Sequence, residues 1–92
     1  MNKKQNLDIV KNFLELLEGV ENVTNSSTEK YLSLDFTIVQ RNCLNETVRG
    51  DFYIIFHDSG NMSIALEDCR QFSIKCNSIK ERTTLIQHIE LD

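Results

Sequence analysis

The side chains best suited to chemistry in this chain are its three cysteines, Cys43, Cys69 and Cys76, and the histidine His57. Structural zinc sites usually take ligands in pairs spaced about two to four residues apart. These cysteines show no such pairing, since Cys76 falls on a core-facing strand position, Cys43 in a loop and Cys69 in a turn. We therefore expect no metal and no cofactor, and thiols that stay free in a reducing compartment.

Two groups of residues could suggest catalysis. His57, Asp58 and Ser59 are consecutive, but neighbours at a strand end point in different directions and cannot form a proton relay, and no nucleophile elbow accompanies them. The adjacent acids Glu67 and Asp68 lie beside a turn, where water surrounds both and nothing separates them into an acid and a base. We expect a protein that is not an enzyme.

The glycines and the net charge argue against nucleotide and nucleic-acid binding. Gly19, Gly50 and Gly60 are too far apart in sequence to form a glycine-rich loop around a phosphate. With 14 acidic against 10 basic residues, the net charge is −4 and the pI about 5.1. Proteins that bind nucleic acids in general carry an excess of Lys and Arg, so we expect no stand-alone nucleic-acid binding.

The N-terminal segment lacks the features of a targeting signal. Asp8, Lys11 and Glu15 interrupt its apolar residues, so the hydrophobic region of a signal peptide is missing. No run approaches the roughly 18 apolar residues of a membrane span. We expect a cytoplasmic protein with no membrane partner, in which the four Asn-x-Ser/Thr triplets carry no glycans.

The elements that position the remaining side chains begin with a helix. Apolar residues recur at spacings of three and four in the N-terminal segment, which predicts an amphipathic helix over residues 7–18. Asn6 is the expected N-cap, and Gly19 supplies the left-handed residue that ends the helix. Residues 21–28 are polar and lack periodicity, which predicts a loop.

Further along, the hydrophobic period changes to two, and the apolar positions are even-numbered in four successive segments. This alternation predicts antiparallel strands with one face on a core and the other in water. Short connections at residues 41–47, 58–60 and 68–70 predict a simple meander. The core is expected to contain Leu34, Phe36, Phe52, Ile54, Phe56, Ile64, Leu66, Phe72 and Ile74, together with Phe13, Leu17, Leu85 and Ile89.

The C-terminal segment returns to helical spacing. Residues 78–81 have the sequence of a capping box, which predicts a second helix over residues 79–90. Residues 1–92 are therefore predicted to form a single α+β domain of two layers, α-β-β-β-β-α. Its sheet is a four-stranded antiparallel meander with both helices on the even-numbered face. Folding a chain of 92 residues buries roughly 65% of its surface. This burial is enough to stabilise the fold without a metal or a disulfide.

The odd-numbered face of the predicted sheet is left open, and we expect a protein partner to bind there. Aromatic and arginine side chains among mixed charges are typical of interface hot spots, although the same residues also fit an ordinary solvated sheet face. The residues expected to lie side by side on it are Tyr31, Asp35, Arg49, Asp51, Tyr53 and Lys75.

A second candidate surface is basic. It could meet RNA phosphates or an acidic protein, even though the whole chain is acidic. The element order differs from the βαββαβ order of the common RNA-recognition fold, and the acids of the sheet face would repel phosphate. The residues of this basic run are Arg70, Lys75, Lys80 and Arg82.

A small, proline-free, tryptophan-free α+β chain without catalytic motifs resembles the small phage-encoded anti-CRISPR proteins. In length and make-up it looks like an inhibitor of the type I-F RNA-guided surveillance complex. The resemblance covers the whole chain but includes no motif, so it transfers no functional residue. It implies a non-enzymatic protein in the host cytoplasm that docks on Cas subunits, with guide RNA within reach, and blocks target DNA binding.

An alternative of the same size class remains open. The chain could be an immunity or antitoxin protein that plugs a bacterial toxin. Both functions predict a monomer that binds its partner one-to-one, without turnover, and the sequence does not separate them.

Overall fold

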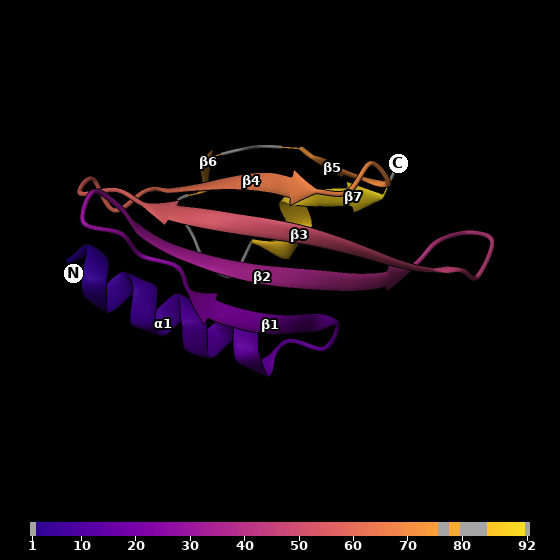
Figure 1. The fold of residues 1–92 in the computed structure, drawn as a ribbon, viewed down its shortest axis with the longest axis horizontal. Helices are drawn as coiled ribbons and strands as arrows, with labels where there is room; N and C mark the ends of the chain where they lie inside the picture. Colours follow the sequence, from indigo (N-terminus) through magenta and orange to yellow (C-terminus); the bar gives the residue numbers. More distant parts are fainter. Residues whose placement is uncertain (1, 76–77, 80–84, 92) are drawn as a thin grey trace.

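A computed structural model describes residues 2–75, 78–79 and 85–91 of the chain. Strands β1, β2, β3, β4 and β6 form one antiparallel sheet in that order, while β5 and β7 pair in a separate two-stranded sheet (Figure 1). The α+β class and the β2-β3-β4 meander are thus confirmed. The elements are α1 (Lys3–Leu16), β1 (Val20–Asn25), β2 (Leu32–Arg41), β3 (Thr47–Phe56), β4 (Met62–Asp68), β5 (Phe72–Ile74), β6 (Ser78–Ile79), the 3₁₀ helix η2 (Ile86–His88) and β7 (Ile89–Leu91).

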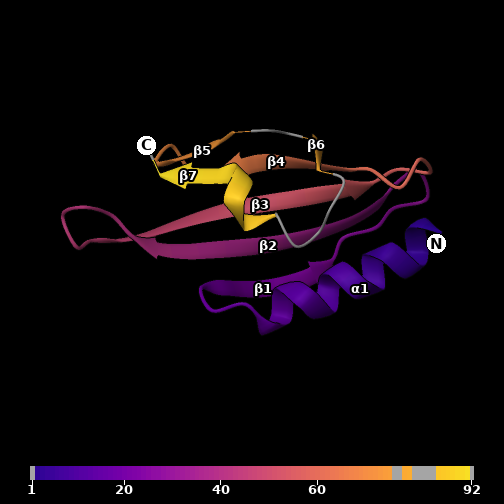
Figure 2. The ribbon, with the colours of Figure 1, turned by 180° about the vertical axis from the view of Figure 1, so that it is seen from behind.

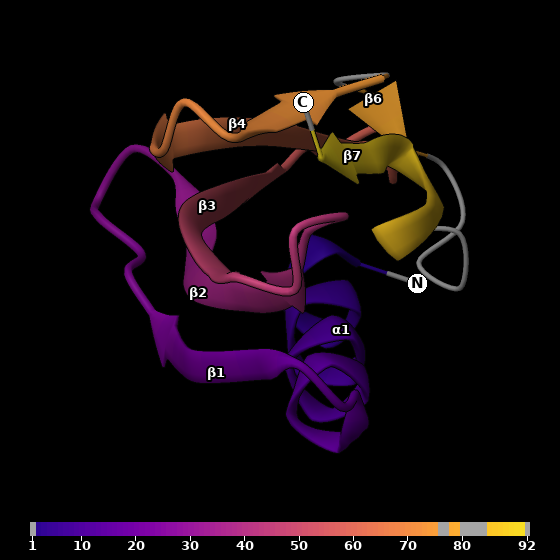
Figure 3. The same cartoon turned by 90° about the vertical axis from the view of Figure 1, so that its right-hand side faces the viewer.

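The large sheet is curved, and its two faces have different neighbours. Helix α1 lies beside β1 and β2, while η2 and β7 lie near β3 and β4, toward the other end of the strand order (Figure 2). Both are on the same side of the sheet when it is viewed from its end (Figure 3). We call this covered side the inner face and the opposite side the outer face.

Helix α1 begins four residues earlier than the apolar pattern predicts. The Asn2 side chain accepts a hydrogen bond from the Gln5 backbone amide at 2.8 Å, and the Gln5 side chain accepts one from the Asn2 amide. This capping box satisfies amides that would otherwise lack partners, so the predicted N-cap Asn6 is wrong. The helix ends at Leu16, and Gly19, with φ +84°, lies in the turn that leads into β1.

Strand β1 occupies most of the segment predicted to be a loop, so that prediction is wrong for residues 21–25 and correct for residues 26–28. Val20 and Val23 both pack against the core, but a bulge between Glu21 and Thr24 breaks the two-residue alternation. Asn22 takes a positive φ of 56° in this bulge, which asparagine tolerates better than most residues. The strand is therefore an edge strand whose polar composition conceals it.

The even-numbered strand residues do face the core, as the alternation predicts. Phe36 and Phe52 stack with ring centroids 5.7 Å apart, and Phe72 meets Phe52 edge-on at 5.5 Å. From α1 the buried residues are Leu7, Val10 and Leu14, whereas Phe13 is only partly buried. The buried hydrophobic residues are Leu7, Val10, Leu14, Leu34, Phe36, Ile38, Val48, Phe52, Ile54, Phe56, Met62, Ile64, Phe72, Leu85 and Ile89, with Leu17, Leu66 and Ile74 partly buried beside them.

The C-terminal part of the chain differs from the prediction. The expected fourth meander strand exists as β5, but it pairs with β7 rather than β4. The next neighbour of β4 in the large sheet is β6, at Ser78–Ile79. The second helix is not confirmed: the described part of residues 79–90 is a strand residue, a 3₁₀ turn and a strand, and residues 80–84 lie outside the described residues. Leu85 and Ile89 are nevertheless buried, as expected.

Within the described part of the chain, no helix has the length and apolar character needed to cross a membrane.

Candidate protein-binding surface

The outer face is built by the odd-numbered residues of β2 and β3. These strands pair along ten consecutive positions, which places Asp35 opposite Tyr53, Thr37 opposite Asp51 and Val39 opposite Arg49. Side chains on alternate strand positions point to the same side of a sheet. Helix α1, η2 and β7 all lie on the other side of the sheet (Figure 3). Four predicted site residues, Asp35, Arg49, Asp51 and Tyr53, are therefore brought together.

Two carboxylates at the centre of the outer face accept hydrogen bonds from neutral hydroxyl groups. Ser26 Oγ donates to Asp35 Oδ1 at 2.9 Å, and Thr37 Oγ1 donates to Asp51 Oδ1 at 2.8 Å. Neither aspartate belongs to an ion pair among the described residues. A hydroxyl orients a carboxylate without cancelling its charge.

More negative charge lies along the neighbouring strand. Asp68 of β4 is directly opposite Asp51, and a bulge at this point adds the exposed Glu67. Carboxylates directly across a strand pair repel each other. This repulsion between carboxylates should slightly lower the folding stability of the free protein.

Arg49 supplies positive charge on this face, but it has a partner. Its Nη1 atom lies 2.8 Å from Glu21 Oε2 of β1, and both side chains are largely exposed. Glu21 could not be predicted as its partner, because β1 has the polar composition of a loop. An exposed pair of this kind contributes little to stability, but it reduces the positive charge that Arg49 could offer a partner.

Half-buried apolar side chains lie among these charges. Tyr53 has Asp35 on one side and Ala65 of β4 on the other, and Ile55 follows it two residues along β3. Tyr53, Ile55 and Val39 are each partly exposed. The face therefore offers an aromatic ring and two aliphatic side chains within an acidic border.

The other predicted site residues lie elsewhere. Tyr31 is 56% exposed in the loop before β2. Lys75 follows β5 and pairs with Glu90 at 2.9 Å, so its predicted place beside Tyr53 is wrong: the strand before it pairs with β7, outside the large sheet. Arg70 is exposed in the turn between β4 and β5. Lys80 and Arg82 lie outside the described residues.

Among residues with catalytic potential, His57 Nε2 lies 2.7 Å from Ser63 Oγ. This contact resembles the nucleophile and base of a hydrolase, but Asp58, the acid beside His57 in sequence, pairs with Lys3 at 3.1 Å. Both His57 and Ser63 are at the surface, and no third group orients the imidazole in the described structure. Within those same residues, no cluster of His, Cys, Asp or Glu could hold a metal ion.

Comparison with known proteins adds no relative to this picture. No protein-family model, curated protein or solved structure matches the chain.

Proposed function

We propose that this protein is a non-enzymatic inhibitor that binds a Cas RNA-guided surveillance complex through its outer sheet face and blocks target DNA binding. The observation that carries the proposal is the acidic character of that face. Asp35 and Asp51 form no ion pair among the described residues, and Glu67 and Asp68 extend the negative charge along β4. The channel that holds guide RNA and target DNA in such complexes is positively charged, so an acidic protein surface complements it.

Inhibition of this kind needs no chemistry. Target recognition depends on base pairing between guide RNA and one DNA strand, and the protein channel only accommodates the duplex. A small monomer seated on the channel, with guide RNA within reach, excludes the incoming DNA. Carboxylates on the inhibitor then occupy the basic positions in the channel that phosphates of the target DNA would otherwise contact.

Tyr53 is the expected energetic centre of the contact. It lies in the middle strand of the face, with Ile55 nearby and Asp35 opposite. Central aromatic residues surrounded by polar groups carry a disproportionate share of binding energy at protein interfaces. Truncation of Tyr53 to alanine should therefore cost about 2 kcal/mol or more of binding free energy.

The test measures target-DNA binding by a purified type I-F complex in the presence of the protein. Wild type should abolish DNA binding, and the variant Asp51→Lys plus Glu67→Lys should restore it, because charge reversal opposes a basic partner. The matched control is Asp8→Lys plus Glu18→Lys, which changes the net charge equally at exposed positions on and after α1. This control should inhibit as wild type does.

Two outcomes would contradict the proposal. If wild type leaves DNA binding unchanged at micromolar excess, the Cas complex is not the partner, and recovery of a toxin by affinity capture would favour the immunity-protein alternative. If wild type inhibits and the outer-face variant, folded by circular dichroism, inhibits equally well, another surface makes the contact.

A further inference from the structure

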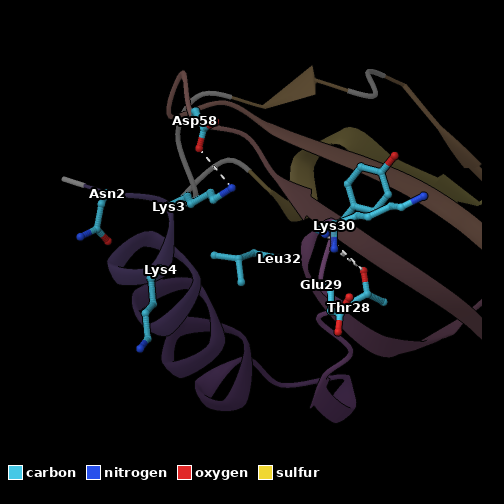
Figure 4. A pocket seen from close by; sticks show the side chains of 9 residues that line it. Asn2, Lys3, Lys4, Thr28, Glu29, Lys30, Leu32 and Asp58 are labelled. Atoms are coloured by element: carbon cyan, nitrogen blue, oxygen red, sulfur yellow. Dashed lines mark hydrogen bonds and ion pairs between the residues drawn. The ribbon is translucent and has the colours of Figure 1, made fainter.

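The loop that joins β2 and β3 extends beyond every other described element at one end of the molecule (Figure 1). We call residues 42–46 the hairpin tip. Among the described residues, the tip forms no ion pair and hydrogen-bonds only within its own hairpin. The turn after β3, at the opposite end, differs because Asp58 pairs with Lys3 of α1 at 3.1 Å (Figure 4). The hairpin tip is therefore accessible to a partner from several sides.

The hairpin tip carries a large apolar side chain in water. Leu44 is 73% exposed, whereas the residues of hairpin loops are more often polar or glycine. Scattered apolar side chains are normal at protein surfaces, and Leu16, at the end of α1, is 86% exposed. Leu44 differs from Leu16 in its place on an extended loop and in the way that its backbone is held.

Hydrogen bonds fix the backbone of the hairpin tip. Asn42 Oδ1 accepts hydrogen bonds from the amides of Leu44 and Glu46, each at 3.0 Å. The Asn42 amide donates to the Glu46 carbonyl, and the Asn45 amide donates to the Asn42 carbonyl, both at 3.0 Å. Arg41 Nη1 donates to the side-chain oxygen of Asn45 at 3.0 Å. Because the loop is already ordered, binding through Leu44 loses little free energy to ordering it.

The composition of the hairpin tip indicates the chemistry of the partner. Residues 42–45, Asn-Cys-Leu-Asn, include no Asp, Glu, Lys or Arg. An RNA strand is held mainly through its phosphates by basic side chains, and these four residues provide none. A membrane surface needs far more apolar area than one leucine supplies. An apolar pocket in a protein, bordered by groups that hydrogen-bond to the flanking amides, fits the tip best.

We propose that the hairpin tip inserts Leu44 into an apolar pocket on a protein subunit of the surveillance complex. The identity of this complex rests on the proposed function. Strands β2 and β3 also build the outer face, so the same two strands carry both contacts. The acidic outer face binds the basic channel, and Leu44 anchors the protein to a subunit surface beyond it.

The experiment measures the affinity of the protein for a purified type I-F complex by surface plasmon resonance. Leu44→Ala should weaken binding about tenfold or more, because it removes apolar surface that the pocket buries. Leu44→Met keeps most of that apolar volume and should retain most of the affinity. Asn42→Ala should weaken binding several-fold while Leu44 is present, because the tip loses the acceptor of two amides. The matched control is Leu16→Ala, which truncates an exposed leucine outside the tip and should leave the affinity unchanged.

The class of molecule that Leu44 contacts is tested by crosslinking. A diazirine analogue of leucine at position 44 should crosslink to a Cas protein subunit on irradiation of the complex. Crosslinks to guide RNA or to no subunit, an unchanged affinity of Leu44→Ala, or an equal loss in Leu16→Ala would overturn the hairpin contact. Each of these results leaves the inhibition of DNA binding by wild type, and so the proposed function, intact. A wild-type protein that does not bind the complex would overturn both.

Discussion

Neighbouring residues in β3 should respond very differently to truncation. Phe52 is fully buried between Phe36 and Phe72, whereas Tyr53 is on the outer face and partly exposed. Phe52→Ala leaves a cavity in the core and should cost about 3–5 kcal/mol of unfolding free energy. Tyr53→Ala should cost much less, because solvent and flexible neighbours replace the lost contacts. Urea denaturation of both variants measures the difference, and equal losses would contradict the assignment of the two faces.

One substitution on the acidic outer face, Asp51→Asn, should raise the stability of the free protein and weaken its binding to a basic partner. Asp51 is directly across from Asp68, and their charges repel. Asp51→Asn removes this repulsion while the new amide oxygen can still accept the hydrogen bond from Thr37. The free protein should gain a few tenths of a kcal/mol, on the order expected for one cross-strand pair, and bind its basic partner more weakly.

Thermal unfolding at low and high salt checks the stability part of that prediction. Salt screens exposed charges, so the gain should shrink at high salt. Asp68→Asn is the matched control, since it relieves the same repulsion from the other strand. A loss of stability in both variants would show that the two carboxylates do not oppose each other.

At the scale of the elements, the sequence predicts the faces of the sheet better than its edges. The parity of Phe36, Phe52 and Ile64 is correct because a central strand has a neighbour on each side and must alternate to fill the core. Strand β1 escapes detection because it has one sheet neighbour and a bulge at Asn22, so only two of its residues contact the core and their spacing is three. Its polar composition is normal for an edge strand.

The C-terminal segment shows a second limit of pattern reading. Leu85 and Ile89 have helical spacing and are buried as expected, yet Ile89 begins strand β7. A spacing of four residues fits a helix, but it also fits a 3₁₀ turn that leads into a strand. Long-range pairing of Ile74 with Ile89 determines the outcome, and no local pattern encodes it.

The candidate site, like the fold, could be predicted from the sequence only in part. Asp35, Arg49, Asp51 and Tyr53 could be grouped because they share one parity on two adjacent strands. The Arg49–Glu21 pair could not, because it joins strands that only the folded chain brings together.

The packing of β5 against the sheet makes a prediction about the glycine in β3. A Cβ atom built at Gly50 would lie 2.6 Å from Cδ2 of the buried Phe72 ring. Replacement of a strand glycine by alanine is normally neutral or stabilising, but Gly50→Ala should cost about 1–3 kcal/mol because the core is overpacked. The sign of the change in urea denaturation therefore reports on whether β5 covers this position.

A double-mutant cycle makes the test specific. Phe72→Leu removes the ring atoms that the new methyl group would meet, so Gly50→Ala should be much less harmful in that background. Additive effects of the two substitutions would show that Phe72 does not pack on Gly50.

At the scale of the whole molecule, the charge distribution should govern how fast the proposed complex forms. The net charge of −4 and the acidic outer face attract a basic surface over about one Debye length, roughly 10 Å at 0.1 M salt. The association rate with the surveillance complex should therefore fall as salt rises from 50 to 500 mM, while the dissociation rate changes little. Surface plasmon resonance measures both rates.

Asp35→Asn plus Asp51→Asn should flatten the salt dependence of association, whereas Asp8→Asn plus Glu18→Gln, with the same net charge, should preserve it. Equal flattening by both pairs would assign the attraction to net charge rather than to the outer face, and a salt-independent wild-type rate would remove electrostatic steering from the mechanism.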